Sequence, residues 1–532
     1  MSDIKKKIAS LSPEKRAQLA KQLQQKAAKN AVPPPARRKG DGPPPLSYAQ
    51  QRVWFLDQLE PGTTAFNLPT ALRLEGPLNV PALERALTEL TRRHEALRTS
   101  FRDEGGTPLQ DVHPPSPFPL PVVDLSGRED REAEALRIVT HETTRPFNLA
   151  TGPLLRAMLL RLEVARHVLV LTMHHIVSDG WSMGVLIREL TALYPAFVAG
   201  QPSPLPELPL QYGDFAAWQR DWLKGETLET QLQWWRQQLA GAPELELPGD
   251  FPRPRHSRHL GGHTTLSLPR DVSAAFSELC KAEGITPFMA VLAAFQVVLG
   301  RYSGQDDIVV GSPIAGRNHH EVEGLVGFFL NTLVLRTRLT GDPTVRELLG
   351  RVRQVALDAF AHQHVPFEHL QPPEGGRGQH FNVMFMMQNF GKLDLELPGL
   401  TVSGVELPEQ AAKFDLTLTC VEGPDGLHGV LEYDAEVFER STAERMLKHL
   451  HQVIATMVAR PDGKLSRLEL LDADEKHRLL KDWHGARAEF PDGATLGGLI
   501  REQARRAPEA VAAVVDGQQL TYAELERRAN AL

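Results

Sequence analysis

Residues 167–194 read HVLVLTMHHIVSDGWSMGVLIRELTALY, and this stretch carries most of the information about architecture. Its first half is a continuous apolar run with the length of a buried strand. Its second half places leucines at helical spacing, at Leu186, Leu190 and Leu193. A turn between a buried strand and a helix can hold side chains against a ligand. We therefore expect a functional site at this turn, which contains His174, His175, Asp179 and Gly180.

The two adjacent histidines cannot share one role, because neighbouring strand residues face opposite ways. Only one of His174 and His175 can point into a given cleft, and the other must be packed or structural. A histidine titrates near pH ~6.5 and can accept or hold a proton on an attacking nucleophile. The residues alone make a buried structural pair the default interpretation. The His-x-x-x-His spacing of a zinc site is absent, so no metal is expected.

The residues that follow the histidines are expected to shape the turn. Asp179 more plausibly orients it by pairing with an arginine than acts as a second base. Gly180 permits the close approach of backbone or ligand.

The composition predicts a soluble globular protein. Of 532 residues, 42% are hydrophobic and 23% charged, and no apolar run approaches the ~18 residues of a membrane span. The net charge of -7 gives no overall attraction to nucleic acid. Two cysteines, Cys280 and Cys420, exclude a disulfide framework and indicate a reducing cytosol. The first residues lack the apolar segment of a secretion signal. We expect a cytoplasmic protein that binds neither nucleic acid nor membrane.

Helical and strand-like stretches alternate through the body, which predicts an α/β fold. Proline-rich and polar segments near its middle, at 202–210 and 249–262, favour two lobes. The basic N-terminus predicts one or two short helices, with either a solvated face or a docking role. The expected organisation is a helical docking or tether segment at 1–30, a proline-rich linker at 31–45, a body at 46–470 with lobes at about 46–220 and 221–470, a linker at 471–495, and a C-terminal segment at 496–532.

Six stretches form an ordered set of motifs: Leu46–Trp54, Arg93–Phe101, His174–Gly180, Tyr212–Gln219, Gly316–Asn318 with Val326–Leu333, and His364–Glu368. Together they resemble the core motifs of nonribosomal peptide synthetase condensation domains. One departure is Gly378-Gln379-His380, where the family usually has an Asn-Pro-Leu lead-in to the next strand. We expect this departure to affect local loop packing and not the chemistry.

The resemblance implies two chloramphenicol-acetyltransferase-like lobes in a V-shaped pseudodimer, with a tunnel from either face to a central histidine. It implies peptide-bond formation between two thioesters on the phosphopantetheine arms of an upstream donor and a downstream acceptor carrier protein. No cofactor would be bound to the chain itself, and a monomer is expected. The run Ser178–Leu186 most resembles domains of the LCL type, which join two L-configured residues.

The resemblance also assigns roles to individual residues. His175 would be the catalytic residue, either positioning the acceptor amine or taking its proton as the amine attacks the donor carbonyl. His174, Asp179 and Gly180 would be structural parts of the motif, with Arg98 or Arg317 as the partner of Asp179. The helix beginning near Trp181 would stabilise the developing oxyanion. Four residues are expected to line the tunnel, namely Ser178, Trp181, Ser182 and Asn331.

Residues 496–532 resemble the start of an adenylation domain, with Leu520–Leu525 like its first core motif. No phosphate loop follows, so the sequence predicts no ATP activation here and a downstream adenylation domain as partner. Two alternatives to peptide-bond formation remain. A coenzyme A-dependent acyltransferase would share the histidine and aspartate, and a non-catalytic docking domain of the same fold would not need an intact His175.

The remaining aromatic and histidine residues of the motifs are assigned no chemistry. Tyr212 and Trp218 are expected to pack on helix faces. Four histidines without metal-ligand spacing are expected to be surface or capped residues, namely His319, His320, His362 and His364.

Overall fold

A computed structural model describes residues 32–40, 42–254, 260–370, 380–388, 395–405, 407, 412–423, 425–483 and 493–532. The expected N-terminal helical segment at 1–30 lies outside the described residues, as do Gly378 and Gln379 of the departure from the family motif. Residues up to Leu470 form one compact unit, and Leu471–Leu532 form a second.

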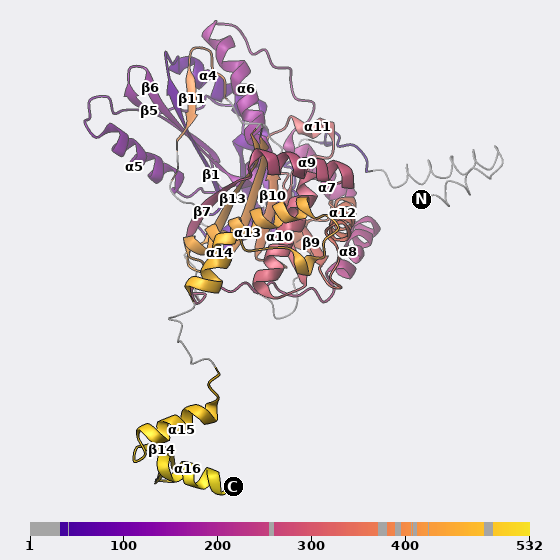
Figure 1. Ribbon diagram of the computed structural model, residues 1–532. Coiled ribbons are helices and arrows are strands. Elements are labelled where there is room, and N and C mark those ends of the chain that lie inside the picture. Colours follow the sequence, from indigo (N-terminus) through magenta and orange to yellow (C-terminus); the bar gives the residue numbers. More distant parts are fainter. Residues whose placement is uncertain are drawn as a thin grey trace, which may run out of the picture. The chain divides into compact units, whose positions relative to one another are not determined.

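The first lobe is built on a five-stranded sheet in the order β11-β1-β6-β5-β4. Its strands are β11 (Thr401–Gly404), β1 (Asn67–Glu75), β6 (Arg166–His174), β5 (Leu155–Glu163) and β4 (Val122–Asp124). Helices α4 (Val80–Arg93) and α6 (Gly180–Val198) pack on one face, and α5 (Arg131–Thr143) covers the other (Figure 1). Both faces of β6 are therefore buried: Leu169 joins the core under α4 and α6, and Val168 joins the core under α5. Burial on both faces explains why this strand is apolar without alternation.

The second lobe is built on a six-stranded sheet in the order β7-β13-β12-β10-β8-β9. Its strands are β7 (Gly261–Ser267), β13 (Gly426–Asp434), β12 (Leu416–Gly423), β10 (Val383–Gln388), β8 (Asp307–Ile314) and β9 (Asn331–Arg338). Its helices are α8 (Gly225–Leu239), α9 (Arg270–Glu283), α10 (Pro287–Ser303), α12 (Val345–Ala361) and α13 (Arg440–Ala459). One large core joins these helices to the sheet. The two sheets confirm the expected α/β fold in two lobes.

The second half of the chain also contributes to the first lobe, which the expected division near residue 220 does not include. Strand β11 comes from the C-terminal half but pairs antiparallel with β1, Leu72 lying opposite Gly404. A third core joins both halves. It takes side chains from α3 (Tyr48–Leu59), the 3₁₀ turn η2 (His175–Val177), α7 (Tyr212–Trp222) and the segment 322–330, which begins in the short helix α11 (His320–Glu323).

Smaller elements complete the first unit: the 3₁₀ turns η1 (Glu95–Arg98), η3 (Phe367–His369) and η4 (Leu465–Arg467), and the hairpin of β2 (Thr99–Glu104) and β3 (Thr107–Val112). The described part of the proline-rich segment before residue 46 has no helix, yet it is fixed to α7. The Arg38 amide donates to Asp214 (3.1 Å), and the Trp218 indole donates to the Pro33 carbonyl (2.9 Å). This segment therefore has contacts that a free tether would lack.

The second unit contains α14 (Ala473–His477), the π-helical turn η5 (Arg478–Asp482), α15 (Leu496–Arg506), the antiparallel strands β14 (Val511–Val515) and β15 (Gln518–Thr521), and α16 (Tyr522–Ala531). Among the described residues, no single helix has the length and apolar character to cross a membrane. Helices α9 and α10 reach that length and apolar character only when they are counted together, across a bend of 106°. Residues 289–300 of α10 are buried, and most of them belong to the core of the second lobe.

Candidate active site

The turn after β6 is built by its own polar groups. Strand β6 ends at His174, the backbone turns through η2, and Asp179 caps α6 by accepting from the Ser182 amide (2.8 Å). The expected close approach of protein backbone at Gly180 is not found, since no described atom lies within 4 Å of where a Cβ would stand. The space beside the first residue of α6 is therefore open to a ligand.

His175 is held from two sides, while one ring nitrogen has no hydrogen-bond partner among the described residues. Its backbone amide donates to the Phe66 carbonyl (2.8 Å), and its ring packs against Phe328 at a centroid distance of 4.7 Å. Its Nδ1 lies 2.8 Å from the Ser178 carbonyl. A carbonyl only accepts, so Nδ1 carries the proton and Nε2 presents a lone pair. The ring is half-buried, which leaves Nε2 accessible to a substrate.

Burial, and then the positive charge of Lys413, lower the pKa of His175 to about 4. The Ser178 carbonyl and Asp179 act in the opposite direction with smaller effect. At neutral pH the imidazole is therefore uncharged. Its Nε2 can accept a hydrogen bond, but this nitrogen has no proton to donate.

His174 occupies a different environment. It is 1% exposed, its Nδ1 accepts from the Ile176 amide (3.2 Å), and its ring packs between Phe66 and Phe147 at 6.0 and 5.7 Å. Burial lowers its pKa to about 3. The structure thus places His174 in the packed interior and His175 at an accessible edge of the same turn.

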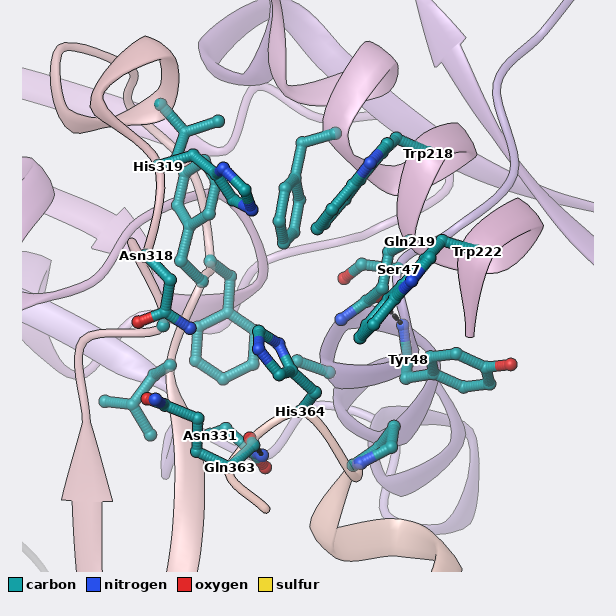
Figure 2. A pocket seen from close by; sticks show the side chains of 18 of the residues that line it. Ser47, Tyr48, Trp218, Gln219, Trp222, Asn318, His319, Asn331, Gln363 and His364 are labelled. Carbon is teal, nitrogen blue, oxygen red and sulfur yellow. Dashed lines mark hydrogen bonds between the residues drawn. The ribbon is translucent and has the colours of Figure 1, made fainter. Parts of the chain in front are cut away.

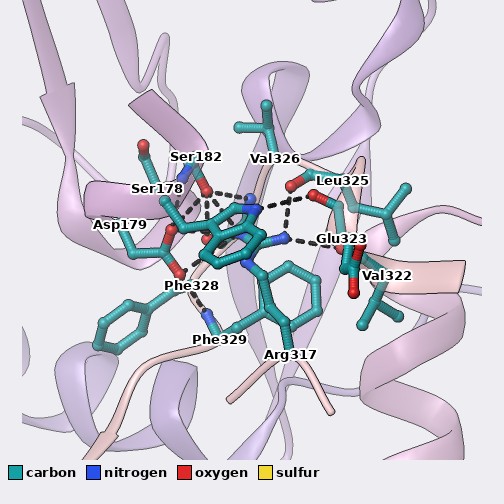
Figure 3. A network of polar contacts seen from close by, with 12 residues as sticks. Ser178, Asp179, Ser182, Arg317, Val322, Glu323, Leu325, Val326, Phe328 and Phe329 are labelled. Carbon is teal, nitrogen blue, oxygen red and sulfur yellow. Dashed lines mark hydrogen bonds and ion pairs between the residues drawn. The ribbon is translucent and has the colours of Figure 1, made fainter. Parts of the chain in front are cut away.

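Asp179 joins the two lobes through a buried polar network (Figure 3). Of the two candidate partners, Arg317 reaches it, with Nη2 3.1 Å from Oδ1 and both side chains at most 3% exposed. The Phe329 amide donates to Oδ2 (3.0 Å), and Arg317 Nη2 also donates to Ser182 Oγ (2.8 Å). The other guanidinium nitrogen, Nη1, donates to the carbonyls of Val322 and Leu325. This network fixes the segment that carries Phe328 against His175.

Arg98, the other candidate, lies elsewhere. It donates to the His113 carbonyl and pairs with Glu95 at 3.5 Å. Burial lowers its pKa, with Glu95 opposing that effect.

The structure corrects part of the expected tunnel lining. Ser178 and Ser182 are fully buried, because the cap of α6 turns Ser182 toward Asp179 and Gly327. Trp181 donates its indole N–H to the Glu323 carbonyl (2.9 Å). The Asn331 side-chain amide donates to the carbonyls of Gln363 and Val365, although Asn331 does line a pocket.

That pocket has aromatic walls (Figure 2), and Phe328 is one of the residues that line it. Trp218 and Trp222 stack in parallel at 5.6 Å, and His319 and His364 meet them edge-on at 5.3 and 4.9 Å. Phe328 therefore contributes to both places, touching His175 and lining this pocket. The sequence prediction missed Trp222 and the pocket roles of Trp218, His319 and His364. The only signal was the helical spacing of the two tryptophans on α7.

The other two histidines differ from each other. His320 is at the surface, whereas His362 stacks on Trp234 at 4.1 Å. Within the described parts of the chain, no group of three or more histidine, cysteine, aspartate or glutamate side chains is placed to hold a metal ion.

Comparison with known proteins agrees with this geometry. Residues 42–480 match the family model of the condensation domain. A linear gramicidin synthase protein of Brevibacillus parabrevis is 46% identical over 498 residues, which cover 92% of this chain but 6% of that protein. The X-domain from teicoplanin biosynthesis, solved in complex with OxyB, superposes with a TM-score of 0.74 at 31% identity, covering 83% of this chain and all of that one.

The first condensation domain of the calcium-dependent antibiotic synthetase superposes with a TM-score of 0.68 over 81% of this chain and all of that one. At 24% identity this likeness bears on the fold alone.

Proposed function

The chain belongs to the condensation domain family, and from this premise we propose that it forms peptide bonds between two carrier-bound thioesters in nonribosomal peptide synthesis. The observation that carries the proposal is the state of His175. It is neutral, half-buried and fixed in one tautomer by Ser178, and Nε2 has no partner in the described part of the chain.

In the proposed reaction, the lone pair of the acceptor amine attacks the donor carbonyl carbon and forms the C–N bond. The C–S bond breaks, and the donor arm leaves as a thiol after taking up the proton that the amine releases. His175 Nε2 accepts a hydrogen bond from the amine and so orients the nitrogen toward the carbonyl. The space beside Gly180, the first residue of α6, is open, whereas the Ser182 amide of the same helix end already donates to the Asp179 carboxylate.

The lowered pKa favours orientation over full proton transfer as the role of His175. Moving a proton from an ammonium with a pKa near ~8 to an imidazole with a pKa of about 4 costs about 5 kcal/mol. Holding the reactants in line can contribute ~7–11 kcal/mol without that cost. We therefore assign His175 mainly to positioning the amine.

The substrates and partners are part of the proposal, because the chain spans 6% of the gramicidin synthase protein that it resembles. We propose donor and acceptor carrier proteins with phosphopantetheine arms, two L-configured residues as substrates, and action in the cytoplasm. The resemblance of Leu520–Leu525 to an adenylation motif supports a downstream adenylation domain as neighbour.

The test is a condensation assay with a loaded donor and a loaded acceptor carrier, read by intact-protein mass spectrometry. The wild type should transfer the donor acyl group to the acceptor carrier, and His175→Ala should lower the rate by about 10²-fold or more, because the amine is no longer held in line with the carbonyl. Equal turnover by the variant would contradict the role of His175. A parallel reaction with a free coenzyme A thioester distinguishes a coenzyme A-dependent acyltransferase.

A second candidate, docking of another protein without catalysis, is supported by the likeness to the X-domain, which was solved in complex with OxyB. Under this alternative the wild type would give no peptide product, and His175→Ala would bind the partner as well as the wild type does.

A further inference from the structure

His94 is a buried histidine that the proposed reaction does not use. It directly follows α4 and is 1% exposed. Its Nδ1 accepts from the Val326 amide (3.3 Å), so this nitrogen carries no proton. The ring proton therefore lies on Nε2, which donates to Glu189 Oε2 (3.0 Å). Both ring nitrogens thus have a partner, one in each half of the chain.

Glu189 holds the His94 ring in this orientation. It lies on α6, and Arg93 donates to both of its carboxylate oxygens (3.1 and 3.0 Å). Arg93 and Glu189 are themselves buried. Because this pair fixes the carboxylate, the imidazole cannot turn without losing a charge-assisted hydrogen bond.

The Val326 amide belongs to a segment, residues 325–329, that forms neither helix nor strand. Side chains of the first lobe bond to its backbone instead (Figure 3). Ser182 Oγ lies 3.1 and 2.9 Å from the amide nitrogen and the carbonyl oxygen of the residue after Val326. The Asp179 carboxylate accepts from the Phe329 amide (3.0 Å). The position of this segment therefore depends on these side chains.

These contacts all refer to one rigid element, helix α6. Its N-cap and first turn supply two of them, and Glu189, which orients His94, lies about two turns further along the same helix. His175 lies in the turn that leads into α6. The segment that carries Phe328 and the turn that carries His175 are thus fixed to the same helix, and the two rings meet at 4.7 Å.

We propose that His94 is a positioning residue of the His175 site. Its Nδ1 holds the Val326 amide and thereby fixes residues 325–329, so that the Phe328 ring stays packed on His175. Loss of this bond leaves a buried amide without its partner and allows the segment to shift. A misplacement of about 1 Å can lower a rate by about 10²-fold. The effect on the rate rests on the proposed function, whereas the effect on the segment does not.

Two substitutions separate the two ring nitrogens of His94. His94→Asn keeps an acceptor at the position of Nδ1 and removes the donor to Glu189. His94→Gln keeps a donor at the position of Nε2 and removes the acceptor for the Val326 amide. Tyr194→Phe is the matched control, because it removes the hydroxyl that accepts from another backbone amide, that of Asn79 (2.9 Å), in the core that includes Val326.

The first experiment measures hydrogen–deuterium exchange of the full chain by mass spectrometry and needs no substrate. In the wild type, the peptide that contains residues 325–329 should exchange slowly, although it belongs to no helix or strand. His94→Gln should speed its exchange by about tenfold, whereas His94→Asn and Tyr194→Phe should leave it close to the wild type. Fast exchange of this peptide in the wild type, or equal acceleration by both His94 variants, would overturn the proposal.

The second experiment compares kcat and KM in the condensation assay for the same variants. His94→Gln should lower kcat by about tenfold or more with little change in the KM for the acceptor carrier, whereas His94→Asn and Tyr194→Phe should retain most of the kcat. Adding Phe328→Ala to both His94 variants should remove the difference between them, because the ring through which His94 acts is gone.

An equal kcat for the two His94 variants, or a difference that persists without the Phe328 ring, would overturn the proposal. Absence of product with the wild type would refute the proposed function alone, because the exchange measurement still decides whether His94 fixes the segment.

Discussion

His175 and Asp179 lie in the same turn, yet their surroundings are opposite. Asp179 is 2% exposed, and its two carboxylate oxygens accept from Ser182, Arg317 and Phe329. His175 is half-buried, and one of its ring nitrogens has no hydrogen-bond partner among the described residues. A group whose bonding capacity is used internally holds the fold, whereas a group with spare capacity is available to a substrate. The motif therefore combines a structural half and a reactive half.

The largest expected effect is on the structural half. Asp179→Ala leaves the Arg317 charge buried without its partner, so we expect a loss of about 3–5 kcal/mol in the free energy of unfolding. Urea unfolding, or insolubility of the variant, checks this. Asp462→Ala is the control, because Asp462 is 80% exposed and pairs with Arg346 at the surface. A folded, inactive Asp179→Ala of normal stability would mean that Asp179 belongs to the reactive half.

The second effect concerns the connection between the halves. The Tyr212 hydroxyl donates to the Phe328 carbonyl (2.5 Å) and lies 2.8 Å from Ser47 Oγ. Tyr212→Phe leaves that buried carbonyl unpaired, so we expect a loss of about 1–3 kcal/mol in stability. The rate of peptide formation should also fall, because Phe328 packs on His175.

Tyr48→Phe is the matched variant, since the Tyr48 hydroxyl donates to the Leu223 carbonyl (3.0 Å) outside the contacts of His175. It should lower stability alone. An equal fall in rate for both variants would contradict a specific link through Phe328.

The third effect is the response of the reactive half to pH. The pKa of His175 is about 4 in the folded protein and near ~6.5 in the unfolded chain. Between these values the unfolded chain binds a proton that the folded protein does not, so stability falls as pH falls through this window. We expect His175→Ala to remove on the order of 1 kcal/mol of the pH dependence between about pH 7 and pH 5. Parallel curves of unfolding free energy against pH for wild type and variant would contradict this.

The smallest effect is expected at Arg98, which belongs to neither half. Its ion pair with Glu95 is 3.5 Å long and partly solvated, so Arg98→Ala should cost under about 1 kcal/mol. Thermal unfolding and the condensation assay should both stay close to the wild type. A loss comparable to that of Asp179→Ala would break the contrast, because it would place a second arginine in the structural network.

Secondary structure that depends on neighbouring residues could be predicted from the sequence. Contacts between segments that are distant in the sequence could not. The apolar run before His174 and the leucines after Asp179 predict a strand, a turn and a helix, all of which are present. The choice between Arg98 and Arg317 could not be made from spacing, because it depends on where the segment 316–330 crosses to the first lobe.

The burial of Ser182, which we had expected to line the tunnel, could have been predicted from the sequence. Asp179 with Ser182 three positions later has the spacing of a helix N-cap, in which the aspartate accepts from that residue's amide. This spacing predicts Ser182 turned toward the cap and away from a tunnel. The pocket of Trp218, His319 and His364 had no comparable signal, because its residues come from four segments that are far apart in the sequence.

The pairing of β11 with β1 has a consequence for engineering. Residues Thr401–Gly404 lie in the second half of the sequence but form an edge of the first sheet, in register with Leu72–Glu75. A chimera that exchanges only the C-terminal half would place a foreign edge strand beside the host's β1. A fragment that ends near residue 220 would leave the backbone amides and carbonyls of β1 unpaired on that side, where they could pair with another chain and cause aggregation. Recombination should therefore transfer Thr401–Gly404 together with the N-terminal half.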